Sequence, residues 1–269
     1  MKDRVIRLIE NNKFIRKIYL SIFNKGVINE AYLFPGYYFR NNEYLIDKDS
    51  CIVSYGSNCQ INGIKIICKG IGNKIVFGNS LLLTDTNNTT IRIQGNNNKI
   101  IIGNKCTITN SSFFIRGNEN KINISSKCSC MMTDFHIEQN CNTLEIGKFT
   151  TMHGRNGNHI LFELDEGKSI IVDEDCMISN GIVFRNSDSH SILNINGNRI
   201  NSAQDIHIGN HCWIGLKSII LKGTKIPDNT IIGAGSLCNK KFEENNTIIA
   251  GVPAKIVKSN VNWDRKFVK

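Results

Sequence analysis

The chain has 269 residues, 41% of them hydrophobic, which is enough for one large domain with a substantial core. No run of sequence approaches the eighteen or so apolar residues that a membrane span requires. The formal net charge of +10 favours anionic partners such as phosphates, acidic glycans or a membrane face. The alternative is that the charge only reflects a general bias in amino-acid composition. Nucleic acid is not an expected partner, because no recognisable nucleic-acid-binding motif is present.

Residues 1–50 come before the repeating pattern of the chain and are expected to form an N-terminal helical or irregular extension. Apolar residues recur at a spacing of three to four over 1–25, which predicts an amphipathic helix. Two interpretations of this helix stay open. It is an end cap or a contact between subunits, or it is a peripheral membrane contact, because basic residues accompany the apolar ones. These basic residues are Arg4, Arg7, Lys13, Arg16 and Lys17.

The ten cysteines are expected to be free thiols and not a disulfide framework. Five of them stand four residues after a hydrophobic residue, in a slot that Ser or Thr fills elsewhere, which predicts small, half-buried core residues. The five are Cys59, Cys106, Cys128, Cys176 and Cys212. The N-terminal segment has scattered charges and no small-residue cleavage site, which is not typical of a secretory signal. We therefore expect a cytoplasmic protein with reduced thiols, at the inner face of the membrane if residues 1–25 bind lipid.

A loose repeat begins at residue 51. Five apolar residues follow similar Asn-, Gly- and Lys-containing segments and stand 22 to 26 residues apart: Ile75, Ile100, Ile122, Leu144 and Ile170. Such a period is typical of a solenoid in which each repeat is one coil. The Asn and Gly residues favour turns, so each of these coils is expected to have one extended corner.

The repeat becomes strict between Ile206 and Leu237. Five isoleucines stand six residues apart, and a small residue follows each one four positions later. They are Ile208, Ile214, Ile220, Ile226 and Ile232. Neither a helix nor an isolated strand explains a period of six, whereas a three-sided coil of about eighteen residues does, with neighbouring coils about 4.8 Å apart. The pattern predicts a β-solenoid domain over 51–237.

A polar, Asn-rich segment interrupts the strict repeat near 185–204. If the period of six continued through this segment, His190, Asn196 and Ser202 would occupy interior positions, where polar side chains are costly. We therefore expect the segment to leave the wall as a protruding loop and to carry function. Residues 238–269 follow the last strict repeat and are expected to close the open end of the solenoid.

Three linked motifs resemble one family of enzymes. They are "CMISNGIVFRNSDSHSI", then "RINSAQDIHIGNHCWIG", then "IIAGVPAKIV" with "IVKSNVNWDR". Together they are similar to hexapeptide-repeat acyltransferases, and in particular to the capsular polysaccharide and sialic acid O-acetyltransferases of bacteria. The resemblance covers roughly 172–265. It implies an all-β fold, the left-handed parallel β-helix or triangular prism, and transfer of acetyl from acetyl-CoA to a glycan hydroxyl.

The resemblance implies two catalytic residues. His190 matches the catalytic histidine of the family, and neutral imidazole suits a general base near pH 7. Trp213 matches a tryptophan beside the acetyl group, where its N–H is an oxyanion donor or its ring a wall of the thioester site. Their alternatives are a surface-loop histidine and an aromatic residue at a subunit contact.

Substrate and donor residues follow from the same resemblance. Asn186 and Asp188 are candidates to orient His190 or to bind sugar, and Arg185 and Arg199 are candidates to bind a sugar carboxylate. Ordinary solvated side chains are the alternative. The CoA arm is expected along the last coils, near a neighbouring subunit of a homotrimer. The residues expected to contact it are Gly215, Ala234, Gly235, Lys240, Lys241 and Lys255.

No metal is expected, because His207 and His211, although four apart, do not share a helix face. Two other functions stay open. One is an N-acetyltransferase acting on a nucleotide-linked amino sugar. The other is a non-catalytic β-solenoid that serves as a scaffold or a binding surface. The sequence does not distinguish a polymeric acceptor from a monomeric or lipid-linked one.

Overall fold

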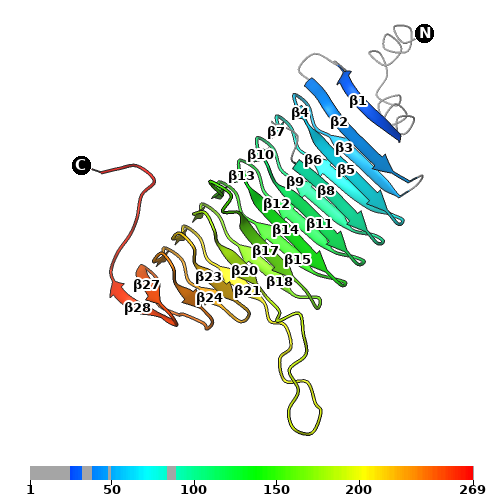
Figure 1. The fold of residues 1–269 in the computed structure, drawn as a ribbon. Coiled ribbons are helices and arrows are strands. Elements are labelled where there is room, and N and C mark those ends of the chain that lie inside the picture. The colour runs from blue at the N-terminus through cyan, green and yellow to red at the C-terminus, as the bar shows by residue number, and fades with distance from the viewer. Residues whose placement is uncertain (1–24, 32–37, 48–49, 84–88, 269) are drawn as a thin grey trace, which may run out of the picture.

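The computed structural model describes residues 25–31, 38–47, 50–83 and 89–268. Over these residues the chain is an all-β, left-handed parallel β-helix of about nine turns, which confirms the predicted fold. Figure 1 shows the turns stacked along one axis, with one long loop leaving the stack beside β21. The amphipathic helix predicted within 1–25 falls on residues outside the described part of the chain, apart from Lys25, which begins a strand.

Each complete turn supplies one strand to each of three walls, and strands of one wall pair in parallel with their equivalents one turn away. The first wall consists of β4 (Gln60–Asn62), β7 (Leu82–Leu83), β10 (Thr107–Thr109), β13 (Ser129–Met131), β16 (Thr151–His153), β19 (Met177–Ile178), β22 (Trp213–Ile214), β25 (Ile231–Ile232) and β27 (Thr247–Gly251).

The second and third walls are built in the same way. The second consists of β5 (Ile64–Lys69), β8 (Thr89–Gln94), β11 (Ser112–Arg116), β14 (Thr133–Glu138), β17 (Ile160–Leu164), β20 (Val183–Arg185), β23 (Ile219–Leu221) and β26 (Leu237–Cys238). The third consists of β3 (Cys51–Tyr55), β6 (Asn73–Phe77), β9 (Lys99–Ile102), β12 (Lys121–Ile124), β15 (Thr143–Ile146), β18 (Ser169–Val172), β21 (Ile206–Ile208) and β24 (Lys225–Ile226).

Antiparallel pairs close both ends of the ladder. At the start, β1 (Lys25–Ala31) pairs with β2 (Tyr38–Ile46), and β2 pairs in parallel with β4 and β5. The ladder thus begins inside 1–50, the range predicted as an extension. At the other end, β28 (Ala254–Ser259) folds back on β27. Covering an exposed sheet edge in this way prevents unwanted strand pairing.

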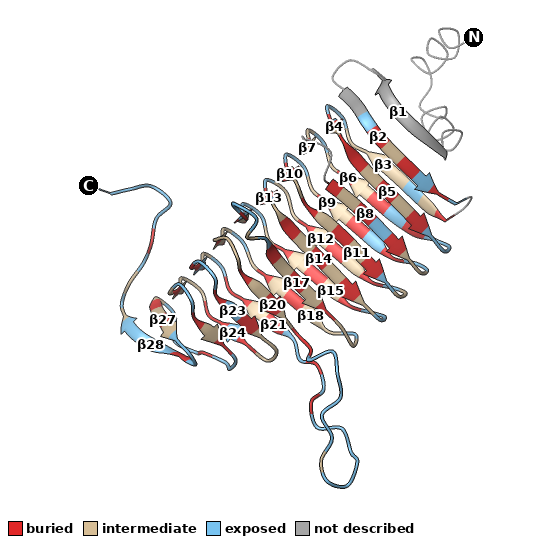
Figure 2. Cartoon of the chain, viewed as in Figure 1, coloured by how far each residue is buried: buried red, intermediate tan, exposed pale blue. Residues whose placement is uncertain are grey.

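Inward-facing apolar residues form continuous columns, as the repeat predicts. Ile75 lies opposite Ile100 in the neighbouring turn, and farther along Ile208 lies opposite Ile226, eighteen residues on. On the second wall four phenylalanine rings stack with centroids 4.4 to 5.4 Å apart: Phe113, Phe135, Phe162 and Phe184. Figure 2 shows buried residues concentrated on the strands, whereas the protruding loop is mostly exposed.

The small residues of the repeat have a specific role at the corner between the third and first walls. Cys59, Cys106, Cys128, Cys176 and Cys212 are buried free thiols, as expected. Each thiol contacts a backbone carbonyl oxygen of the next turn at 3.1 to 3.2 Å. Ser and Thr hydroxyls donate in the same way from the equivalent slots, which explains why the three residue types are interchangeable.

Asparagine has a second role beyond the turn formation that the sequence predicts. Asn73, Asn98, Asn120 and Asn142 are buried at one corner, and the side-chain amides of the last three each donate to the side-chain oxygen of the asparagine one turn before. The same amides also donate to backbone carbonyl oxygens. The ladder therefore satisfies the polar groups of the extended corner, which would otherwise be buried without partners.

Candidate functional site

The protruding segment is a long loop between β20 and β21 that folds back on itself, and we call residues 186–205 the arm (Figure 1). An isolated antiparallel bridge joins Leu193 to Arg199 across it. At the tip, the side-chain oxygen of Asn194 accepts hydrogen bonds from the backbone amides of Asn196 and Asn198. The prediction that this segment leaves the wall is confirmed.

Glu166 holds both stems of the arm. Its carboxylate accepts hydrogen bonds from the Arg199 guanidinium, from the Ser187 hydroxyl at 3.0 Å and from the Ala203 backbone amide at 3.3 Å. The Glu166 side chain is only 17% exposed. The hydrogen bond from Arg199 is the largest cause that lowers the pKa of Glu166 to about 2. Sequence reasoning missed Glu166, because it lies outside the motif and 33 residues before Arg199.

Asp188 anchors the arm to the following turn of the solenoid. Its carboxylate accepts a hydrogen bond from the Lys222 ammonium and another from the Asn201 side-chain amide at 2.8 Å. Lys222, and then Asn201, lowers the pKa of Asp188 below its ordinary value. The same Asn201 amide donates to the backbone carbonyl of His190 at 2.7 Å. Asp188 therefore acts on His190 through Asn201 and the backbone, and Lys222 is a further residue that sequence reasoning missed.

His190 is exposed at the base of the arm. Its backbone position is set by Asn201, which also accepts the amide of Ile192 at 2.8 Å. Within the described residues no hydrogen bond or ion pair of the His190 ring is present. The ring is therefore accessible from solvent, while its backbone is held by Asn201.

Arg185 and Asn186 are placed differently. The Arg185 guanidinium is partly exposed and contacts Glu163 at 3.3 Å and the Ser189 hydroxyl at 3.0 Å. Asn186 is fully buried, and its side-chain amide bonds to the backbone N–H and C=O of Asp165. The prediction that Asn186 binds sugar is therefore wrong, because its polar atoms are used to close a corner of the solenoid.

Trp213 begins β22 on the first wall and is 37% exposed. Its indole N–H points to the Ser179 hydroxyl at 3.4 Å, a long contact that leaves the ring facing outward. Met177 lies opposite Trp213 one turn earlier, and Thr151 opposite Met177. The predicted tryptophan is therefore part of an outer surface and not of the core.

The first wall, which carries Trp213, also carries a histidine. His153 lies at the end of β16, and its Nε2 is 2.9 Å from the Ser129 hydroxyl. Burial and, to a lesser degree, the charge of Arg265 lower the pKa of His153, which favours neutral imidazole at pH 7. The sequence offers no sign of this pair, because the two residues are 24 apart and meet only when their turns stack.

One chain does not bring His190 and Trp213 together. The arm leaves the corner between the second and third walls, whereas Trp213 faces outward from the first wall. No contact between the two rings is present among the described residues. His190 and Trp213 are therefore carried by different sides of the prism.

The small residues predicted at the donor site fall into two groups. At Gly215, a Cβ atom would stand 2.5 Å from the carbonyl oxygen of Ile232 in the next turn, so coil packing already requires glycine there. Ala234 and Gly235 are exposed at the corner one turn later, and a Cβ on Gly235 would meet no atom within 4 Å. This corner is open enough for the close approach of an extended ligand.

The three predicted lysines, Lys240, Lys241 and Lys255, are exposed in the last turns and in β28. Lys241 pairs as an isolated bridge with Lys225, and the Lys240 ammonium lies 5.1 Å from the Phe242 ring centroid. This end of the solenoid is basic and suits a phosphate-bearing ligand.

Two observations concern other ligand classes and membranes. In the part of the chain that the structure describes, no group of three or more His, Cys, Asp or Glu side chains is arranged to hold a metal ion. Over the same residues, no helix has the length and apolar character that crossing a membrane requires.

The left-handed β-helix is the fold of the hexapeptide-repeat acetyltransferases, and comparison with known proteins gives the same class. The polysialic acid O-acetyltransferase of Neisseria meningitidis is 40% identical over 200 residues, which cover 74% of this chain and 89% of that enzyme. No protein-family model matches the sequence. Two solved structures are also similar over 81% of this chain. The polysialic acid O-acetyltransferase OatWY has a TM-score of 0.68 at 33% identity over 93% of its chain, and the polySia specific acetyltransferase NeuO a TM-score of 0.65 at 28% over 91%.

The chain therefore belongs to the polysialic acid O-acetyltransferase family and is an acyltransferase. The resemblance inferred from the three sequence motifs is confirmed.

Proposed function

We propose that the enzyme transfers the acetyl group of acetyl-CoA to a hydroxyl of a bacterial surface glycan that contains sialic acid. The observation that carries this proposal is the 40% identity to a polysialic acid O-acetyltransferase over 200 residues. The net charge of +10 suits an acidic acceptor. The open corner at Ala234 and Gly235 and the exposed lysines of the last turns are the residues that would hold the donor.

His190 is the general base of the proposed reaction. The acceptor oxygen attacks the thioester carbonyl as His190 removes the proton of the hydroxyl. The carbon–sulfur bond then breaks, and the same proton passes from His190 to the departing thiolate, so that no other reactant is needed. Trp213 offers an indole N–H to the developing oxyanion or a ring that walls the thioester. Acetyl-CoA supplies the activated acetyl group when bound.

The arm is the element that brings His190 to the reaction. Arg185 ends β20 just before the arm and Arg199 lies within it, but Arg199 is committed to Glu166. Arg185 has a side chain 40% exposed and is the candidate to meet a sugar carboxylate, which would compete with Glu163 and Ser189 for its guanidinium. Asp188 keeps a positioning role through Asn201.

The proposed site lies between subunits of a trimer, because one chain presents the arm and Trp213 on different sides of the prism. Rings of identical subunits use head-to-tail contacts of two different surfaces, which this arrangement supplies. Four exposed aliphatic side chains on the arm are available for such a contact: Ile192, Leu193, Ile195 and Ile200.

Acceptor-dependent release of CoA thiol from acetyl-CoA tests the reaction. We expect release with polysialic acid or free sialic acid, and a fall of about 10²–10⁴ in turnover for His190→Ala. His207→Ala is the matched control, since His207 is a partly exposed histidine that pairs with Asp173 on the third wall. Full activity of the His190→Ala variant would show that His190 is not the general base. Acetylation of an amine acceptor, with hydroxyl acceptors inert, would favour an N-acetyltransferase instead.

Mixed oligomers test the shared site. His190→Ala and Trp213→Ala chains are each expected to be inactive alone, and to regain activity when refolded together. In a random mixture about one interface in four combines an intact arm with an intact wall, so we expect roughly a quarter of the native activity. No recovery in oligomers shown by mass spectrometry to be mixed would argue that each site belongs to one chain.

A further inference from the structure

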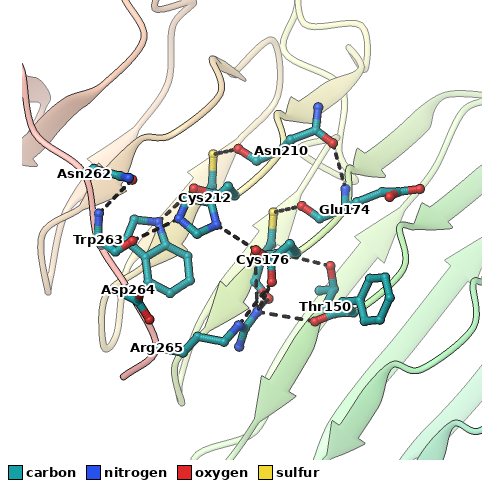
Figure 3. Close-up of polar contacts among 12 residues, drawn as sticks. Thr150, Glu174, Cys176, Asn210, Cys212, Asn262, Trp263, Asp264 and Arg265 are labelled. Atoms are coloured by element: carbon teal, nitrogen blue, oxygen red, sulfur yellow. Dashed lines mark hydrogen bonds and ion pairs between the residues drawn. The ribbon is translucent and has the colours of Figure 1, made fainter. Parts of the chain in front are cut away.

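The C-terminal segment after β28 lies back along the corner between the third and first walls. We call residues 260–266 the strap. It forms no strand, yet the backbone amide of Val261 donates to the carbonyl of Asn246 at 2.9 Å, and Trp263 and Arg265 reach earlier turns. Figure 3 shows the contacts of Trp263 and Arg265, with the strap crossing beside the turns that carry Cys176 and Cys212.

Arg265 is bound more extensively than a solvated arginine. Its Nη2 donates to the backbone carbonyls of Phe149, Asp175 and Cys176 at 3.3, 3.2 and 2.9 Å. Its Nε donates to the Asp175 carboxylate at 3.1 Å, and its Nη1 to the Thr151 hydroxyl at 2.8 Å. One guanidinium thus joins the strap to the corners of two adjacent turns, a task for which a planar fork of donors is suited and an ammonium is not.

Trp263 is the second anchor, and it is buried, with 7% of its surface exposed. The ring stacks on His211 with centroids 4.3 Å apart and planes 11° apart, and the indole N–H donates to the His211 carbonyl at 2.8 Å. The His211 ring nitrogens in turn contact Asp175 at 2.7 Å and the Trp263 carbonyl at 3.0 Å. The Arg265 guanidinium also lies against Trp263, 5.5 Å from the ring centroid.

The strap also contacts the proposed site. The Trp263 and Trp213 ring centroids are 6.1 Å apart with a tilt of 49°, a favourable aromatic geometry. Arg265 bonds to Thr151, which lies on the first wall two turns before Trp213 in the same column. The strap therefore bounds the outer surface on which Trp213 stands, from the side of the corner.

We propose that the strap is a positioning element for acyl transfer, in which Trp263, locked by His211 and Arg265, sets the orientation of the Trp213 ring. The proposal rests on the proposed function, because it gives Trp213 a role beside the thioester. It adds three positioning residues, Trp263, His211 and Arg265, none of which was predicted as part of the site. A ring that is fixed before the donor binds lowers the cost of reaching the reactive geometry.

Fluorine NMR of protein labelled with 5-fluorotryptophan reports the orientation directly, because the chain has two tryptophans and gives two resonances. Trp213→Phe and Trp263→Phe assign them. We expect Arg265→Ala to shift both resonances and to broaden that of Trp213. Arg265→Lys is expected to shift both resonances less than Arg265→Ala does, but not to leave them at their native positions. The control is Arg92→Ala, an exposed arginine on the second wall, which should leave both unchanged.

Steady-state kinetics provide the second measurement. We expect Arg265→Ala to lower kcat about tenfold while the KM of the glycan stays the same, since the strap acts through Trp213. An unchanged thermal midpoint would show that the solenoid is intact, and a chain ending at Ser259 removes the strap altogether. The proposal would be overturned if the Trp213 resonance were unchanged both in Arg265→Ala and in the chain that ends at Ser259. Absence of any acetyl transfer by the native protein would instead count against the proposed function, while the fluorine spectra would still test the strap.

Discussion

The walls of the solenoid and the arm that leaves them are stabilised by different forces. A wall strand is paired on both sides, and its inward side chains belong to apolar columns such as the stack that contains Phe135 and Phe162. The arm has one isolated bridge of its own and no apolar core. Its position depends on two carboxylates, Glu166 and Asp188, and on their cationic partners.

Because of this difference, the walls determine the stability of the molecule and the arm can serve function separately. Each turn covers its neighbours, so burial stabilises the walls throughout their length. A local contact, by contrast, is enough to aim the arm, and charge-assisted hydrogen bonds provide it without hydrophobic surface. We infer that the arm can change orientation or length at little cost to the fold, whereas a change within a wall is transmitted to several turns.

The largest expected effect comes from the wall. Phe162→Ala removes a fully buried ring from the middle of the stack and should lower the free energy of unfolding by about 3–5 kcal/mol. Urea unfolding followed by circular dichroism measures it. Phe114→Ala, which removes a partly exposed ring on the outer side of the same wall, is the control and should cost far less. Equal losses for the two variants would mean that burial of the Phe162 ring in the stack does not determine its contribution to stability.

A smaller effect is expected at the asparagine ladder. Asn120→Ala leaves the side-chain amide of Asn142 without one acceptor and the Gln139 carbonyl without its donor, which should cost about 1–3 kcal/mol. The same unfolding measurement applies. Asn123→Ala, on the outer side of the third wall, should be close to neutral. A neutral result for Asn120 would show that water replaces the lost bonds.

The smallest effect on the whole molecule is expected from Glu166→Gln, and it should be local. Loss of the carboxylate weakens the hold on Arg199, and trypsin cleavage after Arg199 should rise about tenfold, equivalent to ~1.4 kcal/mol of local opening. Glu174→Gln, which affects a more exposed ion pair with Lys148, is the control. If both variants resist trypsin as the native protein does, the arm is held by something other than this carboxylate.

The effect of pH has a defined sign at the same residue. The pKa of Glu166 falls from 4.5 to about 2 in the folded state, so its contribution to arm stability is complete above about pH 4.5 and is lost as the pH falls toward 2. The ratio of pepsin cleavage rates at Leu193 between the Glu166→Gln variant and the native protein should therefore approach one over this interval. A ratio that stays constant would contradict the lowered pKa.

Much of the fold could be predicted from the sequence alone. The interior of a coil must be filled at each turn, so isoleucines at a spacing of six, as at Ile208 and Ile214, reveal the coil directly. The corner position accommodates only small side chains that can donate a hydrogen bond, which is why Cys128 stands where other turns have Ser or Thr. The interruption near His190 indicates the arm, because polar residues do not fit the prism.

The contacts that hold the arm and the strap were decided by the tertiary structure. Glu166 meets Arg199 from 33 residues away, and Arg265 meets Thr151 from 114 residues away, through outward side chains that the repeat does not constrain. Periodicity reports which residues face inward, whereas contacts between outward residues depend on which turns become neighbours. Asn186 shows the same limit, since only its burial distinguishes a corner residue from a sugar ligand.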